Sequence, residues 1–142
     1  MMKRTKKEGT STTRLPDTEL LIMQVVWQHG GCITSAEIMK ELEGKRDWAT
    51  TTVLNLLARL VERGFVSAER KGKANIYTAL VSEEAYLKTE SKSFLERLHG
   101  NSLKSFIASL YEGKNLSKDD AKELKEYLEH GIVFEEEEDG TK

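Results

Sequence analysis

Side chains suited to hydrogen bonding with nucleic acid recur along one short stretch of this 142-residue chain. Thr51 and Asn55 are four residues apart, and Thr52 and Arg59 flank them, so an α-helix would present all four on one side. Short and hydrogen-bonding groups of this kind fit against base edges and phosphates. The stretch therefore predicts a helix that reads DNA.

The same stretch carries apolar residues at helical spacing. Val53, Leu56, Leu57 and Leu60 follow the i, i+3, i+4, i+7 pattern that turns side chains toward one side of a helix. We expect this side to be core, with the polar side opposite it. Gly64 can adopt the left-handed conformation that commonly ends a helix.

Cations cluster in the segment that follows this helix. Two strand-like runs, 65–70 and 75–80, are separated by a short turn that contains Gly72. Arg70, Lys71 and Lys73 lie at the tip of this predicted hairpin, where they could follow a phosphate backbone. Lysine-rich hairpin tips also serve solubility alone, and that alternative stays open.

Two preceding helices must position the reading helix. The first begins at Pro16, runs to about His29 and stops at Gly30 and Gly31. Glu19 lies in its first turn, where a negative charge is favourable near the helix N-terminus. Its apolar stripe is Leu20, Met23, Val26 and Trp27. The second covers about 35–43 and begins with a capping box of Thr34 and Glu37. Three helices and a hairpin in this order predict a winged helix-turn-helix.

Three further amphipathic helices follow the hairpin. They are lightly apolar and bury too little surface to be stable alone, so packing against a second copy of the chain is predicted. The predicted dimerisation residues are Leu87, Phe94, Leu95, Leu98, Leu103, Phe106, Ile107, Leu110, Leu124 and Leu128.

Charge is divided unevenly along the chain. Residues 1–81 hold 13 Lys and Arg against 9 Asp and Glu, whereas residues 82–142 hold 9 against 15. The basic part can approach a polyanion and the acidic part would be repelled by it, although a local excess without function is the alternative. The predicted organisation is a flexible basic arm (1–14), a winged-helix DNA-binding domain (15–81), a helical dimerisation domain (82–130) and an acidic disordered tail (131–142).

Other function classes find little support in the sequence. Cys32 is the only cysteine, and His29, His99 and His130 have no metal-ligand spacing, so no metal site and no cofactor are predicted. No nucleophile has a base at catalytic spacing, and we do not expect an enzyme. Without a long apolar run or a signal segment, the chain is expected to be cytoplasmic and not in a membrane.

These motifs resemble the BlaI/MecI/CopY family of bacterial penicillinase and copper-transport repressors. The resemblance extends over about 15–130 and rests on the first-helix stripe, Ser35-Ala36-Glu37-Ile38, the reading helix and Asn75-Ile76-Tyr77. It implies a dimeric repressor that binds a dyad operator in double-stranded DNA, with Arg59 placed for phosphate and Asn55 for a base edge. The predicted DNA-binding residues are Thr50, Thr51, Thr52, Leu54, Asn55, Arg59, Arg70, Lys71 and Lys73.

The chain departs from this family's pattern in three places. Leu54 stands where the β-lactam branch often has a basic residue, and it could pack on a thymine methyl group. In that branch a sensor-linked protease relieves repression by cutting an Asn-Phe bond, and the corresponding bond here is Asn101-Ser102. Asn101 as the cap of the fifth helix is the alternative. The paired C-terminal cysteines of the copper branch are missing, which argues against copper sensing.

Two other functions remain open at this stage. Winged helices also act as protein-protein interaction modules, with Leu54 and Trp48 here as an exposed apolar docking patch. A small-molecule-responsive regulator would need a ligand cavity, for which the sequence offers no convergent polar residues.

Overall fold

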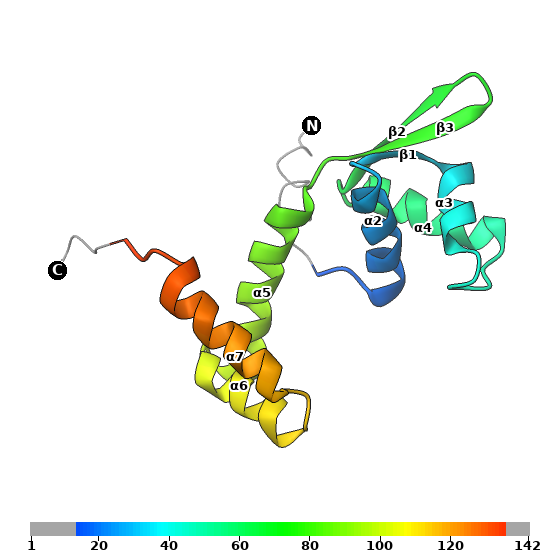
Figure 1. Ribbon diagram of the computed structural model, residues 1–142. Coiled ribbons are helices and arrows are strands. Elements are labelled where there is room, and N and C mark those ends of the chain that lie inside the picture. Colours follow the sequence, from blue (N-terminus) through cyan, green and yellow to red (C-terminus); the bar gives the residue numbers. More distant parts are fainter. Residues whose placement is uncertain (1–13, 136–142) are drawn as a thin grey trace. The chain divides into compact units, whose positions relative to one another are not determined.

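The fold is taken from a computed structural model and is described for residues 14–135 (Figure 1). The chain divides into two compact units between Ser93 and Phe94. The first contains α2 (Asp17–Gln28), β1 (Cys32–Thr34), α3 (Ser35–Leu42), α4 (Thr50–Glu62), β2 (Val66–Lys71), β3 (Ala74–Ala79) and the first part of α5 (Glu83–His99). The second contains the rest of α5, α6 (Leu103–Glu112), α7 (Lys118–Glu126) and the π-helix η1 (Tyr127–Gly131). The helical fold with a small β wing is confirmed.

The first unit has a three-stranded antiparallel sheet in the order β1-β3-β2. β2 and β3 form the predicted wing, and the pairing of Lys71 with Ala74 leaves a two-residue turn in which Gly72 has a φ of 63°. β1 pairs with β3 at Ile33 and Tyr77 and was not predicted. Three residues are too few to show the alternation by which a strand is recognised.

The core of the first unit lies between α2, α3, α4 and the sheet. The predicted stripe of α4 is buried as expected. On α2, however, Ile22 and Val25 are buried, whereas Leu20 and Trp27 are only half-buried. α2 contacts both α4 and β3, so its buried face is wider than the predicted stripe and is centred on different residues.

The start of α5 belongs to the first unit because Tyr86 is buried there. Its ring lies 5.8 Å from that of Trp27 and 5.9 Å from that of Phe65, measured between ring centroids. The backbone N–H of Leu15 donates to the Tyr86 hydroxyl oxygen at 2.9 Å, and burial raises the pKa of this phenol. The division between the units therefore lies inside α5, twelve residues after the boundary expected at 81.

The second unit is helical, and none of its described residues is buried. Three of its aromatic rings are close together, with Phe106 5.5 Å from Phe94 and 5.4 Å from His99 between ring centroids. α7 begins with a capping box between Ser117 and Asp120. The helices expected here are therefore present without a core of their own.

Asn101 does not cap α6, so the alternative prediction that it caps the fifth helix is wrong. It has a φ of 68°, a conformation that asparagine tolerates better than most residues, and its N–H donates to the Leu95 carbonyl at 3.0 Å. The cap is Ser102, whose hydroxyl accepts from the Ser105 N–H at 3.0 Å.

Only Arg14 of the predicted basic arm and residues 131–135 of the predicted acidic tail are described, and the rest of both predicted segments lies outside the described residues. Among the helices that are described, none combines the length and apolar character needed to cross a bilayer.

Candidate nucleic-acid interface

α4 has one buried and one exposed face. Val53, Leu56, Leu57 and Leu60 are buried against the core, and the polar side chains opposite them are exposed. The predicted DNA-binding residues that this exposed face brings together are Thr50, Thr51, Thr52, Leu54, Asn55 and Arg59. One rigid helix thus presents hydroxyl, amide and guanidinium groups on one surface, as reading base edges in a major groove requires.

The N-terminus of α4 is electrostatically suited to an anion. Its N-cap is Ala49, which supplies no side-chain hydrogen bond, and no acidic residue lies in its first turn. The first N–H groups of such a helix and its dipole favour a phosphate. In α3, by contrast, the Thr34 hydroxyl and the Glu37 carboxylate already satisfy the corresponding groups.

The turn before α4 adds two cations that the sequence reasoning did not include. Lys45 and Arg46 are exposed, and the Arg46 guanidinium carbon lies 5.9 Å from the centroid of the Trp48 ring. Because they directly precede the predicted reading helix, the sequence could have indicated them as candidate DNA-binding residues. Trp48 itself is half-buried against the core, so it contributes less exposed apolar surface than the docking-patch alternative assumed.

The C-terminus of α4 is fixed by its backbone. Gly64 has a φ of 84° and donates its N–H to the Val61 carbonyl at 3.0 Å, and the Phe65 N–H donates to Leu60 at 2.9 Å. These two bonds form a Schellman motif, which leads the chain directly into β2. The predicted role of Gly64 is confirmed.

A buried carboxylate on α2 reaches the same end of α4. Glu19 was expected only as a first-turn charge, but its side chain is 2% exposed and pairs with Arg59 of α4 and with Arg63, the C-cap of α4. Arg63 Nη1 lies 3.3 Å from Glu19 Oε1, and Arg59 Nη1 lies 3.7 Å from Oε2. Neither Glu19 nor Arg63 was identified as a site residue, because their contact joins positions 44 residues apart.

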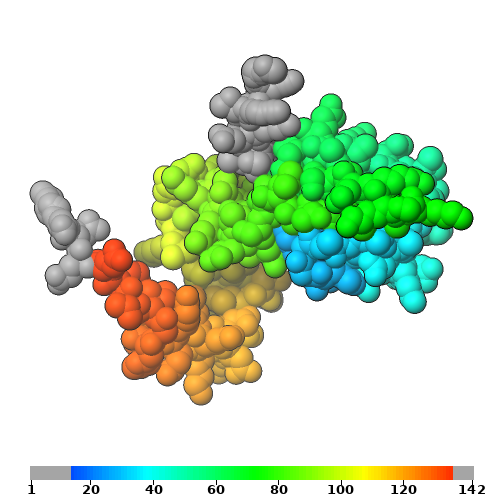
Figure 2. Space-filling view, turned by 90° about the horizontal axis from the view of Figure 1, so that it is seen from above, coloured from blue at the N-terminus to red at the C-terminus, as the bar shows by residue number. Residues whose placement is uncertain are grey.

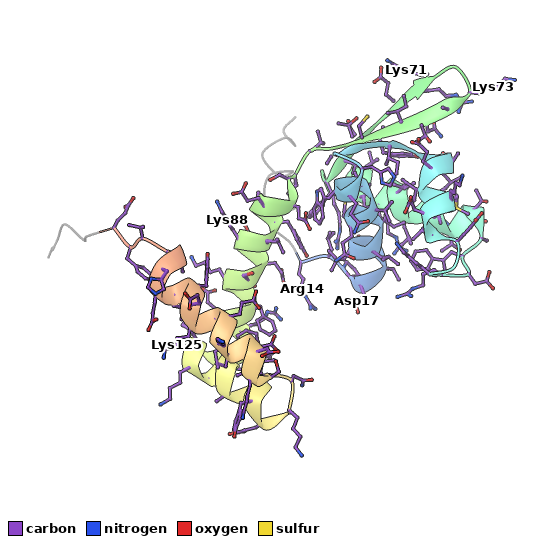
Figure 3. The ribbon with its side chains drawn as sticks, viewed as in Figure 1. Arg14, Asp17, Lys71, Lys73, Lys88 and Lys125 are labelled. Atoms are coloured by element: carbon purple, nitrogen blue, oxygen red, sulfur yellow. The ribbon has the colours of Figure 1, made fainter. Side chains whose placement is uncertain are left out.

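The wing carries its cations where the sequence placed them. Lys71 and Lys73 project from the end of the hairpin (Figure 3), which runs as a surface ridge in the space-filling view (Figure 2). Arg70 is held along the hairpin, with Nε donating to the Gly72 carbonyl at 3.3 Å and Nη1 to the Asn75 amide oxygen at 3.4 Å. Of the three predicted phosphate contacts, Arg70 is therefore the one that the hairpin itself holds in place.

The histidines lie at helix C-termini, and each has a partner. His29 Nε2 is 3.6 Å from Glu41, His99 Nδ1 is 2.9 Å from the Ser105 hydroxyl, and His130 Nε2 is 3.9 Å from Glu129. Within 14–135 no three His, Cys, Asp or Glu side chains gather as a metal site would require.

The predicted dimerisation residues are distributed over both units. Leu87 lies in the first unit, and the others lie in the second. The exposed ones are Leu87, Leu98, Leu103 and Leu128, and the half-buried ones are Phe94, Leu95, Phe106, Ile107, Leu110 and Leu124. At the predicted cleavage position, both Asn101 and Ser102 are exposed.

Comparison with known proteins adds an independent finding. A family model described as "Penicillinase repressor" matches residues 15–130. The chain is 32% identical over 116 residues to the penicillinase repressor of Bacillus licheniformis, which covers 82% of this chain and 90% of that protein. It is 26% identical over 117 residues to the methicillin resistance regulatory protein MecI of Mammaliicoccus sciuri, which covers 82% of this chain and 94% of that protein.

A solved structure also matches part of the chain. The solution structure of the monomeric form of Bacillus licheniformis BlaI in complex with the blaP half-operator is 31% identical, with a TM-score of 0.46. The match covers 53% of this chain and 90% of that one.

Proposed function

We propose that this chain, which belongs to the penicillinase repressor family, binds a dyad operator as a homodimer through α4 and the wing. The family consists of transcriptional repressors, which are not enzymes.

The exposed polar face of α4 is the observation that carries this proposal. It lies opposite a fully buried stripe, so the helix that carries these side chains is held in place, and Lys71 and Lys73 extend from the wing of the same unit. Asn55 is proposed to contact a base edge, Arg59 to contact phosphate, and Leu54 to pack on a thymine methyl group.

Homodimer formation is supported by the composition of the second unit. Its described residues include exposed leucines at 98, 103 and 128 but no buried side chain. A surface of this kind is stabilised when an equivalent surface covers it about a twofold axis. The dimer would then present two α4 helices to two half-sites.

Relief of repression by proteolysis at Asn101-Ser102 is a further part of the proposal. The bond lies between α5 and α6, both residues are exposed, and Asn101 departs from helical backbone geometry. A sensor-linked protease could therefore reach it without first unfolding either helix. Cutting there would separate α6 and α7 from the DNA-binding unit. The cut site would be identified by mass spectrometry of the repressor from induced cells, and cleavage elsewhere or none would contradict this part.

The DNA-binding proposal is tested by fluorescence anisotropy. The full-length protein is titrated against a labelled duplex from upstream of its own gene and against a shuffled duplex, at low and physiological salt. We expect salt-sensitive binding that favours the native sequence, because phosphate contacts release counterions. Binding without sequence preference, or without salt dependence, would contradict the proposal and favour a protein-docking role.

Two substitutions separate the proposed roles on α4. Arg59→Ala should weaken binding to both duplexes and lower the salt slope by about one unit. Asn55→Ala should reduce discrimination at one base position by roughly 1–3 kcal/mol. The controls are Lys125→Ala on α7 and Gln24→Ala on α2, which remove an exposed cation and an exposed amide elsewhere. Equal effects of the two α4 substitutions on every duplex would refute the assignment.

A further inference from the structure

We infer that Glu19 is a positioning residue for DNA recognition, because it orients the Arg59 guanidinium from beneath the reading helix. This inference rests on the proposed function. It adds Glu19, a residue of α2 that lies outside the exposed face of α4, to the residues that determine the affinity for DNA.

The geometry places one carboxylate between two arginines. Arg59 lies in the last turn of α4 and Arg63 is its C-cap, so the two arginines lie four residues apart on one side of the helix end. Each oxygen of Glu19 faces one of them, at 3.3 Å for Arg63 and 3.7 Å for Arg59. A single acid on α2 can therefore hold both side chains.

The two arginines differ in exposure, and this difference separates their roles. Arg63 is 31% exposed and forms the hydrogen bond to Glu19, so it supplies the partner that a buried carboxylate needs. Arg59 is 65% exposed and lies beyond hydrogen-bond distance. Arg63 alone can therefore compensate the charge of Glu19. The attraction between Glu19 and Arg59 instead restricts the directions that the Arg59 side chain can take.

Such restriction has a consequence for binding. A flexible arginine loses rotamer freedom when it is fixed on DNA, and a side chain already held in place loses less. The guanidinium has five N–H donors, so Arg59 can face Glu19 and still bind phosphate. Release of Arg59 is expected to weaken operator binding roughly two- to twelvefold.

The test is a double-mutant cycle with Glu19→Gln and Arg59→Ala in the full-length protein. Binding is measured by anisotropy against the labelled duplex from upstream of the gene, after a thermal melt has shown that each variant is folded. Glu19→Gln should weaken binding, and it should have no further effect when Arg59 is already alanine. Equal effects of Glu19→Gln in both backgrounds would overturn the inference.

Asp17→Asn is the matched control. Asp17 lies in the same first turn of α2 (Figure 3), is exposed, and loses the same charge. Removing an acid from a DNA-binding unit should by itself leave binding unchanged or strengthen it. The two substitutions should therefore act in different directions, and identical behaviour would show that Glu19 acts only through its charge.

Arg59→Lys keeps the inference testable if Glu19→Gln does not fold. Lysine retains the charge but lacks the planar group with fixed donors. We expect it to recover less than half of the loss in log affinity caused by Arg59→Ala, and full recovery would overturn the positioning role. Failure of the wild-type protein to bind DNA would instead overturn the proposed function itself.

Discussion

The two units of this chain differ in how their apolar residues are used. In the first, buried side chains from α2, α3, α4, the sheet and the start of α5 form one continuous core. In the described part of the second, no side chain is buried, and leucines such as Leu98 and Leu103 are more than half exposed. The first unit therefore contains its own stabilisation, whereas the second leaves apolar side chains exposed, as the proposed dimer would require.

Under the proposed function, this difference allows one small chain to separate two tasks. A reading helix must be held rigidly, and the stripe of α4 achieves this within one chain. A pairing region must leave its apolar surface available to a partner. Substitutions at equivalent positions in the two units should therefore have different consequences. Both tryptophans, Trp27 and Trp48, lie in the first unit, so their fluorescence reports its unfolding alone.

The largest effect is expected from truncating the core of the first unit. Phe65→Ala should lower its free energy of unfolding by about 3–5 kcal/mol, because the ring is fully buried. Urea titration followed by tryptophan fluorescence measures this loss. The matched change is Phe106→Ala in the second unit, which should shift the same transition by less than about 0.5 kcal/mol. A similar loss for both would remove the distinction between the units.

The next largest effect is expected on dimerisation. Leu98 and Leu80 are 61% and 60% exposed, in the second and first unit respectively. Leu98→Glu should weaken the dimer by about 3 kcal/mol, roughly a hundredfold, because a twofold axis places the charge in the interface twice. Leu80→Glu should leave the dimer intact. Sedimentation velocity over a range of protein concentrations compares them, and equal weakening would contradict the assigned interface.

A smaller effect is expected from the helix caps. α3 and α7 both begin with a capping box, formed by Thr34 with Glu37 and by Ser117 with Asp120. Thr34→Ala should lower the stability of the first unit by about 1 kcal/mol. Ser117→Ala should reduce the helical circular dichroism signal but should not shift the unfolding transition of the first unit, as followed by tryptophan fluorescence. If the transition moved equally for both, α7 would be contributing to the stability of the first unit.

The smallest effect concerns the acid dependence of the α3 cap. The Thr34 backbone N–H, and then its hydroxyl, hold the pKa of Glu37 below its usual value of 4.5. Because the folded-state pKa is lowered, the stabilisation is complete above the unfolded value and is lost as pH falls through the folded one. Thr34→Ala should raise the pKa of Glu37 part of the way toward 4.5, as measured by an NMR titration. No change would mean that the hydroxyl does not contribute.

Local features of the fold could be predicted from the sequence. The α4 stripe, the glycine that ends α4, the α3 capping box and the wing depend on residues within a few positions of one another. Spacing and turn chemistry express such features directly. The exposed positions of α4 followed from the same spacing, because whatever lies opposite a buried stripe faces outward.

Features that depend on distant contacts could not be predicted. Glu19 carries no local sign that it is buried, since its partners, Arg59 and Arg63, lie forty or more positions later in the chain. The burial of Tyr86 likewise depends on Trp27 and Phe65, and it moved the division between the units into α5. β1 needs the edge of β3 to become a strand at all.

The central claim is that the first unit binds DNA and the second unit pairs two chains. The most direct test is to let the full-length protein select DNA from a random duplex library and to sequence the bound pool. We expect an inverted repeat whose half-site centres lie about one helical turn apart, roughly 10 base pairs, or a multiple of that spacing. Enrichment of a single unrepeated element, or of no sequence, would contradict the account.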